Sequence, residues 1–167
     1  MENNYSEIKK LNKILKENIK VETLNKPISG LTSIRYKQKI NYKPDYQRNY
    51  VWKEDKATYF IESIFLGTDI PPLVFFNVGG EIEIIDGRQR FETIIRFIDD
   101  QLKLKENGLK KLPDLKGKVF STLKSSRHDL LDIFLDCSIR IIEFSIVNIP
   151  PLRIEMQDKI KKEIFSR

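Results

Sequence analysis

The sequence predicts a single α+β domain in which a small mixed sheet is covered by helices. One observation is that apolar residues recur at helical spacing in several separate segments. Another is that two short apolar runs, LVFF at 73–76 and EIEII at 81–85, flank Gly79-Gly80 as the strands of a β-hairpin do. The length of 167 residues is typical of one globular unit with a substantial core.

The N-terminal segment predicts an amphipathic helix. Over residues 3–19 the apolar positions share one helical face: Ile8, Leu11, Leu15 and Ile19. The charged start MENNYSEIKKLNK lacks the apolar centre of a signal peptide. No stretch approaches the roughly 18 apolar residues that span a membrane, so we expect a cytoplasmic protein without a membrane partner.

Two short elements are expected next. Ser29 is a suitable N-cap for a short helix that contains Leu31 and Ile34. Residues 39–42 alternate like a strand, which Pro44 ends.

Residues 53–66 predict a helix that packs into the core. Gly67 follows it where a C-terminal cap belongs. Its apolar stripe is expected to be buried and structural, and consists of Ala57, Phe60, Ile61, Ile64 and Phe65.

The hairpin ends at Asp86-Gly87, and a helix is predicted directly after it from the spacing of Phe91, Ile94, Ile95 and Ile98. A turn-rich stretch over 107–117 then leads to the last expected elements. These are a helix over 121–136, a strand over 139–144 and a helix from about residue 152.

Composition limits the chemistry. Thirty Lys and Arg against 24 Asp and Glu give a formal charge of +6, which favours polyanionic partners weakly because the lysines are spread along the chain. One cysteine, Cys137, excludes an internal disulfide, and its apolar neighbours predict a buried thiol. With His128 as the one histidine, the usual zinc ligand set is missing, although carboxylates remain able to hold magnesium.

The segment Asp86-Gly87-Arg88-Gln89-Arg90 stands where a strand passes into a helix. The start of a helix favours the binding of an anion on physical grounds. The first amides of a helix lack intrahelical partners, and the helix dipole is positive there. Gly87 permits a tight turn, the two arginines offer guanidinium groups to phosphate oxygens, and Asp86 suits a ribose hydroxyl, a magnesium-bound water or the turn itself. The alternative is a helix-entry turn followed by surface arginines.

A second cluster, DYQRNYVW at 45–52, packs three aromatic residues, an amide and a guanidinium into eight positions. The alternative here is a packed loop in which Tyr50 and Trp52 cover the next helix and Arg48 pairs with an acid.

Three separated motifs, PDYQRNYVW, IESIFLGTDIPPLVFF and IIDGRQRFETIIRFI, resemble in order and spacing the N-terminal domain of GmrSD-type, modification-dependent restriction enzymes. The resemblance continues through LKGKVFSTL at 115–123 and starts at about Pro27. It implies a fold related to that of ParB and sulfiredoxin. We therefore assign 1–26 to an N-terminal helical extension and 27–167 to the ParB-like domain.

The resemblance also implies which residues bind a nucleoside triphosphate with Mg²⁺. In the family the second motif is more often DGQQR, so Arg88 replaces a glutamine here. Family members also have an IF-R-N-G motif where this chain reads IFSR, and we expect this chain to lack the complete motif. We assign no residue as a metal ligand, since Mg²⁺ is expected only together with the nucleotide. We assign catalytic roles to Asp86 and Arg90, and nucleotide binding to Tyr46, Gln47, Arg48, Gly87, Arg88, Gln89 and Thr93.

The expected function is that of a nucleotide-binding and hydrolysing regulatory module that controls DNA cleavage in phage defence. Arg48 and Arg90 then clamp phosphates, and the two motifs converge on one pocket. DNA and a C-terminal nuclease domain or partner subunit are the expected partners, because one histidine cannot make a histidine-asparagine-histidine nuclease site. The alternatives are a DNA-binding module without nucleotide turnover and a weak ParB-like nuclease.

Overall fold

The computed structural model describes residues 2–40, 50–147 and 152–165. Its centre is one four-stranded mixed sheet of β1 (Ile19–Pro27), β2 (Leu73–Val78), β3 (Glu81–Asp86) and β4 (Ser138–Ile146), in the order β1-β4-β2-β3. β4 pairs antiparallel with β1 and parallel with β2, and β2 pairs antiparallel with β3. The predicted α+β class with a mixed sheet is confirmed.

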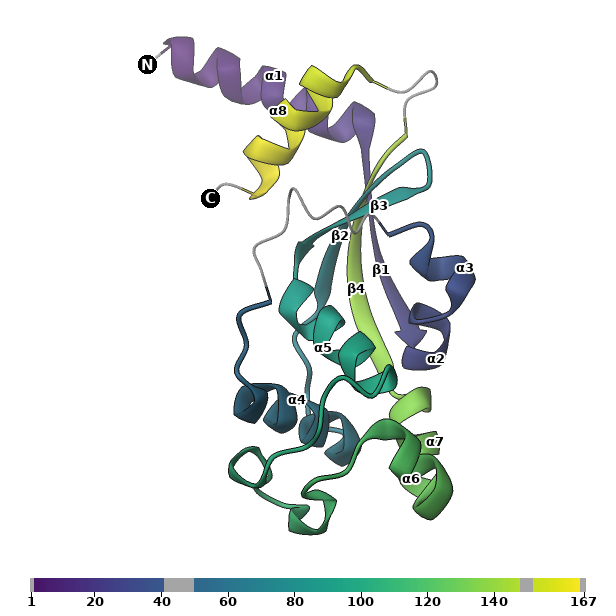
Figure 1. Cartoon of the computed structure of the whole chain (residues 1–167). Coiled ribbons are helices and arrows are strands. Elements are labelled where there is room, and N and C mark those ends of the chain that lie inside the picture. Colours follow the sequence, from purple (N-terminus) through teal and green to yellow (C-terminus); the bar gives the residue numbers. More distant parts are fainter. Residues whose placement is uncertain (1, 41–49, 148–151, 166–167) are drawn as a thin grey trace.

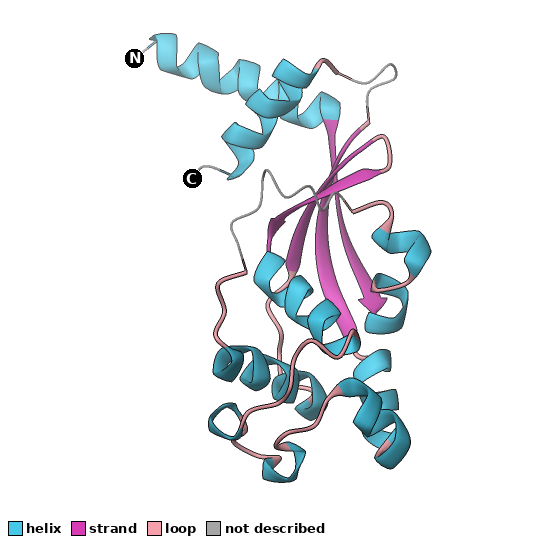
Figure 2. Ribbon diagram, viewed as in Figure 1, coloured by secondary structure: helices cyan, strands magenta, loops and turns pink. Residues whose placement is uncertain are grey.

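The helices are distributed around this sheet (Figures 1 and 2). α5 lies across one face, α4, α6 and α7 gather near one end of the strands, and α1 and α8 lie at the other end with both chain termini. Their bounds are α1 Glu2–Asn18, α2 Ile28–Leu31, α3 Ile34–Lys37, α4 Glu54–Leu66, α5 Arg88–Ile98, α6 Phe120–Ser126, α7 His128–Asp136 and α8 Ile154–Phe165, with 3-10 turns η2 Glu106–Gly108 and η3 Pro113–Leu115.

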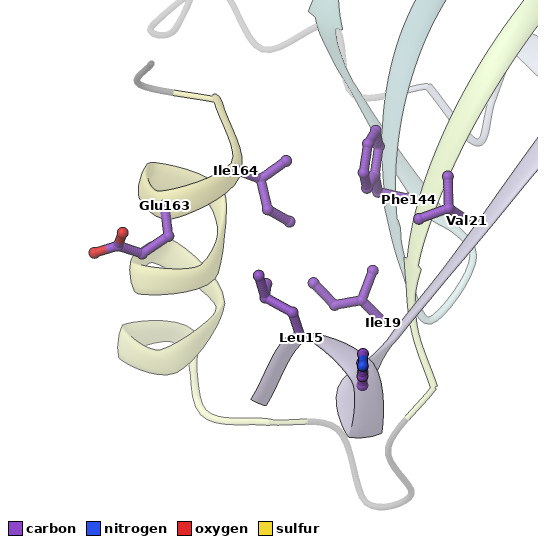
Figure 3. Close-up of a pocket in the computed structure, with 7 residues that line it drawn as sticks. Leu15, Ile19, Val21, Phe144, Glu163 and Ile164 are labelled. Carbon is purple, nitrogen blue, oxygen red and sulfur yellow. The ribbon is translucent and has the colours of Figure 1, made fainter. Parts of the chain in front are cut away.

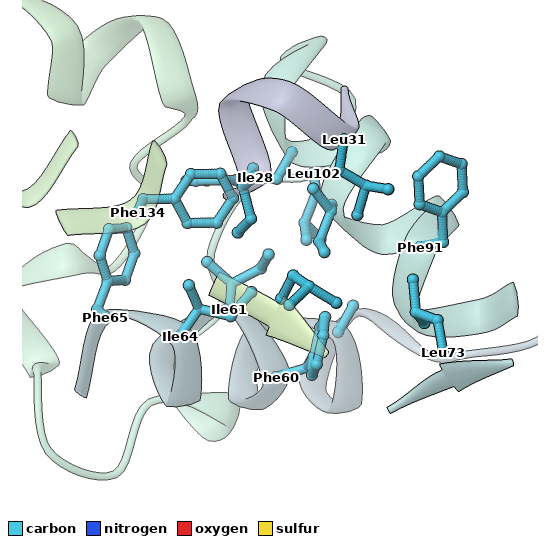
Figure 4. Packing of buried hydrophobic residues seen from close by; sticks show 14 of the residues in the cluster. Ile28, Leu31, Phe60, Ile61, Ile64, Phe65, Leu73, Phe91, Leu102 and Phe134 are labelled. Atoms are coloured by element: carbon cyan, nitrogen blue, oxygen red, sulfur yellow. The ribbon is translucent and has the colours of Figure 1, made fainter. Parts of the chain in front are cut away.

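The main core lies between one face of the sheet and the helices α2, α4, α5 and α7 (Figure 4). The predicted stripe of α4 is buried there: Ala57, Phe60, Ile61, Ile64 and Phe65. Phe65 contacts the rings of Phe97 and Phe134 at 6.2 and 5.6 Å between centroids. A smaller cluster on the other face packs α8 against the sheet through Phe76, Ile146 and Ile160.

Several predicted elements are confirmed closely. α4 begins after Lys53, and Gly67 ends it in the left-handed conformation at φ 67°. Gly79 and Gly80 connect β2 to β3, and α5 follows Gly87 directly.

Four expectations are wrong in detail. The first helix ends at Asn18, and residues 19–27 form strand β1, so the helical character assigned to 19–26 is corrected, while the domain boundary at 27 stays a prediction. Ser29 lies inside α2, which has no side-chain cap, and the capping side chain in this region is Ser33, which accepts from Tyr36 N at the start of α3. Cys137 is half-buried, not fully buried.

The fourth correction concerns the helix expected over 121–136, which is two helices. Arg127 leaves the helical region at φ −141° and ψ 66°. Its guanidinium donates to both carboxylate oxygens of Asp129, at 3.0 and 2.9 Å, at the start of α7. Ile40 makes a parallel bridge to Ile82, while the rest of the strand expected at 39–42 lies partly outside the described residues.

Candidate functional site

The candidate site is built on the turn that joins β3 to α5. Gly87 adopts φ 89°, a left-handed conformation that L side chains rarely adopt. A Cβ at this position would also collide with the side chain of Leu73 and would lie 2.8 Å from Arg90 Nη2. Glycine is therefore required here twice, by the backbone angle and by the close approach.

α5 starts with its first amides directed out of the helical ladder. Its first intrahelical bond runs from Phe91 N to Gly87 O at 3.0 Å. The preceding N–H groups, from Arg88 to Arg90, have no carbonyl one turn back, which leaves them as potential donors to an anion. Asp86, at the end of β3, keeps 72% of its side chain exposed beside this turn.

Arg90 ties the start of α5 to the start of β2. Its Nη2 donates to Pro72 O at 2.9 Å and lies 3.9 Å from Asp86 Oδ2. The side chain is 17% exposed, and among the described residues its Nε has no hydrogen-bond partner, as is also true of Arg88 Nε. Buried guanidinium nitrogens usually have partners, so within the described ranges each of these two arginines has one unpaired donor.

Gln89 holds the segment that follows the Tyr46-Gln47-Arg48 motif. Its Oε1 accepts from Val51 N at 3.1 Å and from Trp52 N at 3.3 Å. The side-chain oxygen of Gln89 is therefore engaged by two backbone donors. A role of Gln89 in nucleotide binding stays a prediction.

Tyr50 is held against α5 by Thr93 and Arg96. Thr93 Oγ1 lies 2.7 Å from both Gln89 O and the Tyr50 hydroxyl. Because the threonine proton goes to the carbonyl, the Tyr50 hydroxyl donates to Thr93. The Arg96 guanidinium stacks 4.0 Å from the centre of the Tyr50 ring. Burial raises the pKa of Tyr50, against the lowering effects of Thr93 and Arg96, so it stays a neutral donor.

Thr93 is fully buried, so in this conformation it positions Tyr50 and does not line a cavity. Its assigned nucleotide-binding role stays a prediction.

Trp52 continues from this segment onto α4. Its ring meets Phe60 edge-to-face with 5.6 Å between centroids, and Lys56 Nζ lies 4.8 Å from its centre. The packed-loop alternative is therefore right about Trp52, which covers the next helix, whereas Tyr50 contacts α5.

A pocket of about 590 Å³ opens beside Trp52 and Arg90. Its walls are mainly apolar, from Trp52, Phe60, Leu66, Ile70 and Pro71. Cationic side chains line it from three elements: Lys56 of α4, Arg90 of α5, and Lys110 and Lys111 of the loop between η2 and η3. Its volume lies within the range of small-molecule sites, roughly 300–1,000 Å³.

The structure thus brings together Asp86 to Arg90, Thr93 and the Tyr50–Trp52 segment. Tyr46, Gln47 and Arg48 lie outside the described residues, so their convergence with Asp86–Arg90 stays a prediction. Tyr50 and Trp52 stand two to six positions after them in the sequence and contact α5 and α4.

Sequence reasoning missed the residues of the opposite pocket wall. Neither feature stands out in the sequence, because Lys110-Lys111 is one basic pair among many lysines and Glu62 is one polar residue among several on an amphipathic helix. A weak signal was available, since Gly108 stands shortly before the pair in a loop.

A second cavity of about 430 Å³ lies between α1, α8 and the sheet (Figure 3). Leu15, Ile19, Phe144 and Ile164 point into it. Polar groups do not converge here as they do around Arg90, and the pocket carries no chemistry of its own.

Other kinds of site find little support in the described part of the chain. It holds no group of three or more His, Cys, Asp or Glu that would bind a metal ion on its own. His128 is exposed at the start of α7, as expected for a helix-surface residue. None of the helices described is long and apolar enough to cross a membrane.

The comparisons with known proteins bear on the whole domain. The family model described as "GmrSD restriction endonuclease, N-terminal domain" matches residues 28–167, which is most of the chain and includes both motifs. No curated protein and no solved structure matches. The relation to ParB and sulfiredoxin therefore remains an implication of the sequence resemblance.

Proposed function

Because this chain belongs to the family of GmrSD restriction endonuclease N-terminal domains, we propose that it is the nucleotide-sensing module of a restriction system. It binds a nucleoside triphosphate at the start of α5 and, through that binding, controls DNA cleavage by a nuclease domain or partner subunit. One observation carries the proposal: Arg90 belongs both to the Gly87 turn and to the wall of the aromatic pocket, where four cationic residues face two acidic ones, Glu62 and Asp69.

Each part of the site suits one part of a nucleotide. The apolar wall around Trp52 suits the flat face of a base. The amides of Arg88 to Arg90 and the guanidinium group of Arg90, which lines the pocket, suit phosphate oxygens.

Asp86 suits the cation that accompanies the phosphates. Magnesium is commonly held by one or two carboxylates together with substrate phosphates, and Asp86 is an exposed carboxylate beside the helix start. Magnesium neutralises the charge on the phosphates when it is bound.

The proposed hydrolysis would use the same groups. Asp86 would orient a water toward the terminal phosphorus. As the new P–O bond forms, the bond to the bridging oxygen breaks and the water gives up a proton, so that a nucleoside diphosphate and inorganic phosphate result. Arg90 stabilises the negative charge that develops on the oxygens.

DNA binding without nucleotide turnover is the second candidate, and the exposed lysines at the pocket favour it. Lys110 and Lys111 would attract DNA phosphates as well as nucleotide phosphates. The two candidates differ in how strongly they depend on a single arginine.

The sole tryptophan of the chain makes the proposal directly measurable. We expect ATP, GTP, CTP or UTP with magnesium to change Trp52 fluorescence saturably, because Trp52 lines the pocket. Calorimetric titration of the same samples checks that the signal reports binding. The proposal fails if none of the four nucleotides binds by either method at millimolar concentration.

A further inference from the structure

One face of α4 holds the loop that follows α5. Glu54, Thr58 and Glu62 are spaced four residues apart and therefore share a face. Glu54 pairs with Lys105 Nζ at 3.2 Å, and Thr58 Oγ1 accepts from Lys105 N at 3.0 Å.

The loop also packs tightly on this face. A Cβ at Gly108 would collide with the backbone of Asp55 and would lie 2.6 Å from Thr58 Cβ, so the chain approaches α4 as closely as glycine permits.

Glu62 makes the strongest attachment. Its carboxylate accepts from three consecutive backbone N–H groups, those of Lys110, Lys111 and Leu112, at 2.9 to 3.0 Å. The residue is only 2% exposed, and its negative charge is compensated by the loop backbone. Such an arrangement fixes the backbone of the loop at the residues that carry the lysines.

The two lysines that this carboxylate fixes both line the pocket that Arg90 lines. Both are exposed, and within the described ranges neither ammonium group lies within 4.0 Å of a carboxylate oxygen, although the charge of Lys110 does interact with the Glu62 carboxylate. Both ammonium groups can therefore approach an anion in the pocket. Other lysines nearby are engaged: Lys105 pairs with Glu54 and Lys116 with Glu106.

We propose that Lys110 and Lys111 form a second phosphate-binding wall of the pocket, facing the same ligand as Arg90, and that Glu62 is the positioning residue that holds this wall in place. The ligand chemistry is a polyphosphate chain, either of a nucleotide or free. If the polyphosphate belongs to a nucleotide, this inference rests on the proposed function; if it is a free polyphosphate, it does not.

The experiment measures binding of two probes, a nucleoside triphosphate with magnesium and inorganic tripolyphosphate, to the whole chain by calorimetry. The test variant is Lys110→Gln with Lys111→Gln, and the control is Lys103→Gln with Lys124→Gln. The control removes the same charge at two exposed lysines outside the pocket. The test pair is expected to weaken both probes by about tenfold or more, and the control by about threefold or less, because contacts outweigh diffuse attraction.

The positioning role is tested by adding Glu62→Ala to both backgrounds. If Glu62 acts through the lysines, its removal weakens tripolyphosphate binding in the wild type and has little further effect in the Lys110 and Lys111 double variant, since effects through one shared unit are not additive. Equal losses in both backgrounds would show that Glu62 acts only on general stability and would overturn its positioning role.

The remaining outcomes separate the two proposals. If the triphosphate binds and the test pair behaves as the control does, the second wall is refuted while the proposed function stands. If tripolyphosphate binds through the lysines and no nucleotide binds, the wall stands and the proposed function is refuted. If neither probe binds the wild type, both are refuted.

Discussion

At the scale of single residues, Glu62 shows how a buried charge can serve a fold. Burial acts to raise the pKa of its carboxyl, but hydrogen bonds from the backbone of Lys111, Lys110 and Leu112 outweigh this effect and hold the pKa below its ordinary value of 4.5. The carboxylate therefore stabilises the folded state at pH values above 4.5. This stabilisation is lost as the pH falls through the lower, folded-state pKa.

Glu62→Gln is accordingly expected to be less stable than the wild type at neutral pH, by about 1.5 to 3 kcal/mol, the usual contribution of hydrogen bonds to a charged group. The difference should shrink as the pH falls below 4.5 and the wild-type carboxylate becomes protonated. Urea denaturation at several pH values measures it, with Glu81→Gln, exposed at the start of β3, as the control. A difference that does not depend on pH would mean that the charge of Glu62 is not what holds the loop.

Residue by residue, the sequence predicted the turn better than the pocket. Gly87 and Arg90 stand within a local pattern, because a strand, a glycine and a helix follow one another without interruption. Glu62 and Lys110 lie 48 positions apart, and nothing local indicates that a helix carboxylate will meet a loop backbone. Such long-range polar pairs become visible only in the folded chain.

At the scale of elements, the Tyr50–Trp52 segment is attached to α5 chiefly through side-chain contacts. Gln89 accepts two of its backbone N–H groups, and Thr93 accepts from the Tyr50 hydroxyl. The segment therefore depends on the same helix turn that we assign to phosphate binding, which couples the aromatic wall to the anion site.

Gln89→Ala is expected to loosen this segment without unfolding the domain, because it removes two partly exposed hydrogen bonds worth about 0.5 to 1.5 kcal/mol each. Acrylamide quenching of Trp52 fluorescence should increase, while Gln101→Ala, at an exposed glutamine after α5, should leave it unchanged. Unchanged quenching in the Gln89 variant would indicate that Trp52 is held by its contacts with α4, through Phe60 and Lys56.

Elements with a strong apolar period were predictable, and those defined by tertiary contacts were not. α4, α5 and the β2–β3 hairpin carry clear stripes or runs ended by glycine. β1 is rich in polar residues and becomes a strand because it pairs with β4 along its whole length, more than a hundred positions away. Likewise, the break at Arg127 comes with a contact between its side chain and Asp129, which a periodicity does not encode.

At the scale of the whole molecule, the sheet order places the β3–α5 turn next to α4. β2 and β3 form one edge of the sheet, and Arg90 bonds back to Pro72 just before β2. The pocket therefore forms where three segments meet: the Trp52 segment with α4, the start of α5, and the Glu62-held loop. Both chain termini lie at the opposite end of the molecule, beyond the sheet (Figure 1).

This arrangement makes Arg90 the residue on which nucleotide binding should depend most. A DNA backbone attracted by dispersed lysines does not require a guanidinium at one helix start, whereas a triphosphate held by that helix start does. The comparison of nucleotide and DNA affinities therefore separates the two candidate functions.

The decisive measurement is the affinity of the wild type, Arg90→Ala and Arg140→Ala for a nucleoside triphosphate with magnesium and for DNA at two salt concentrations. Arg140 is exposed on β4 and serves as the charge-matched control. Circular dichroism verifies folding, and Arg90→Lys replaces Arg90→Ala if loss of the bond to Pro72 unfolds the alanine variant. The account predicts that nucleotide binding falls roughly tenfold or more in the Arg90 variant alone, since a charged hydrogen bond contributes about 1.5 to 3 kcal/mol, while DNA binding falls about equally in both variants. Equal losses for nucleotide and DNA in the Arg90 variant, or nucleotide binding that Arg90 and Arg140 affect alike, would contradict it.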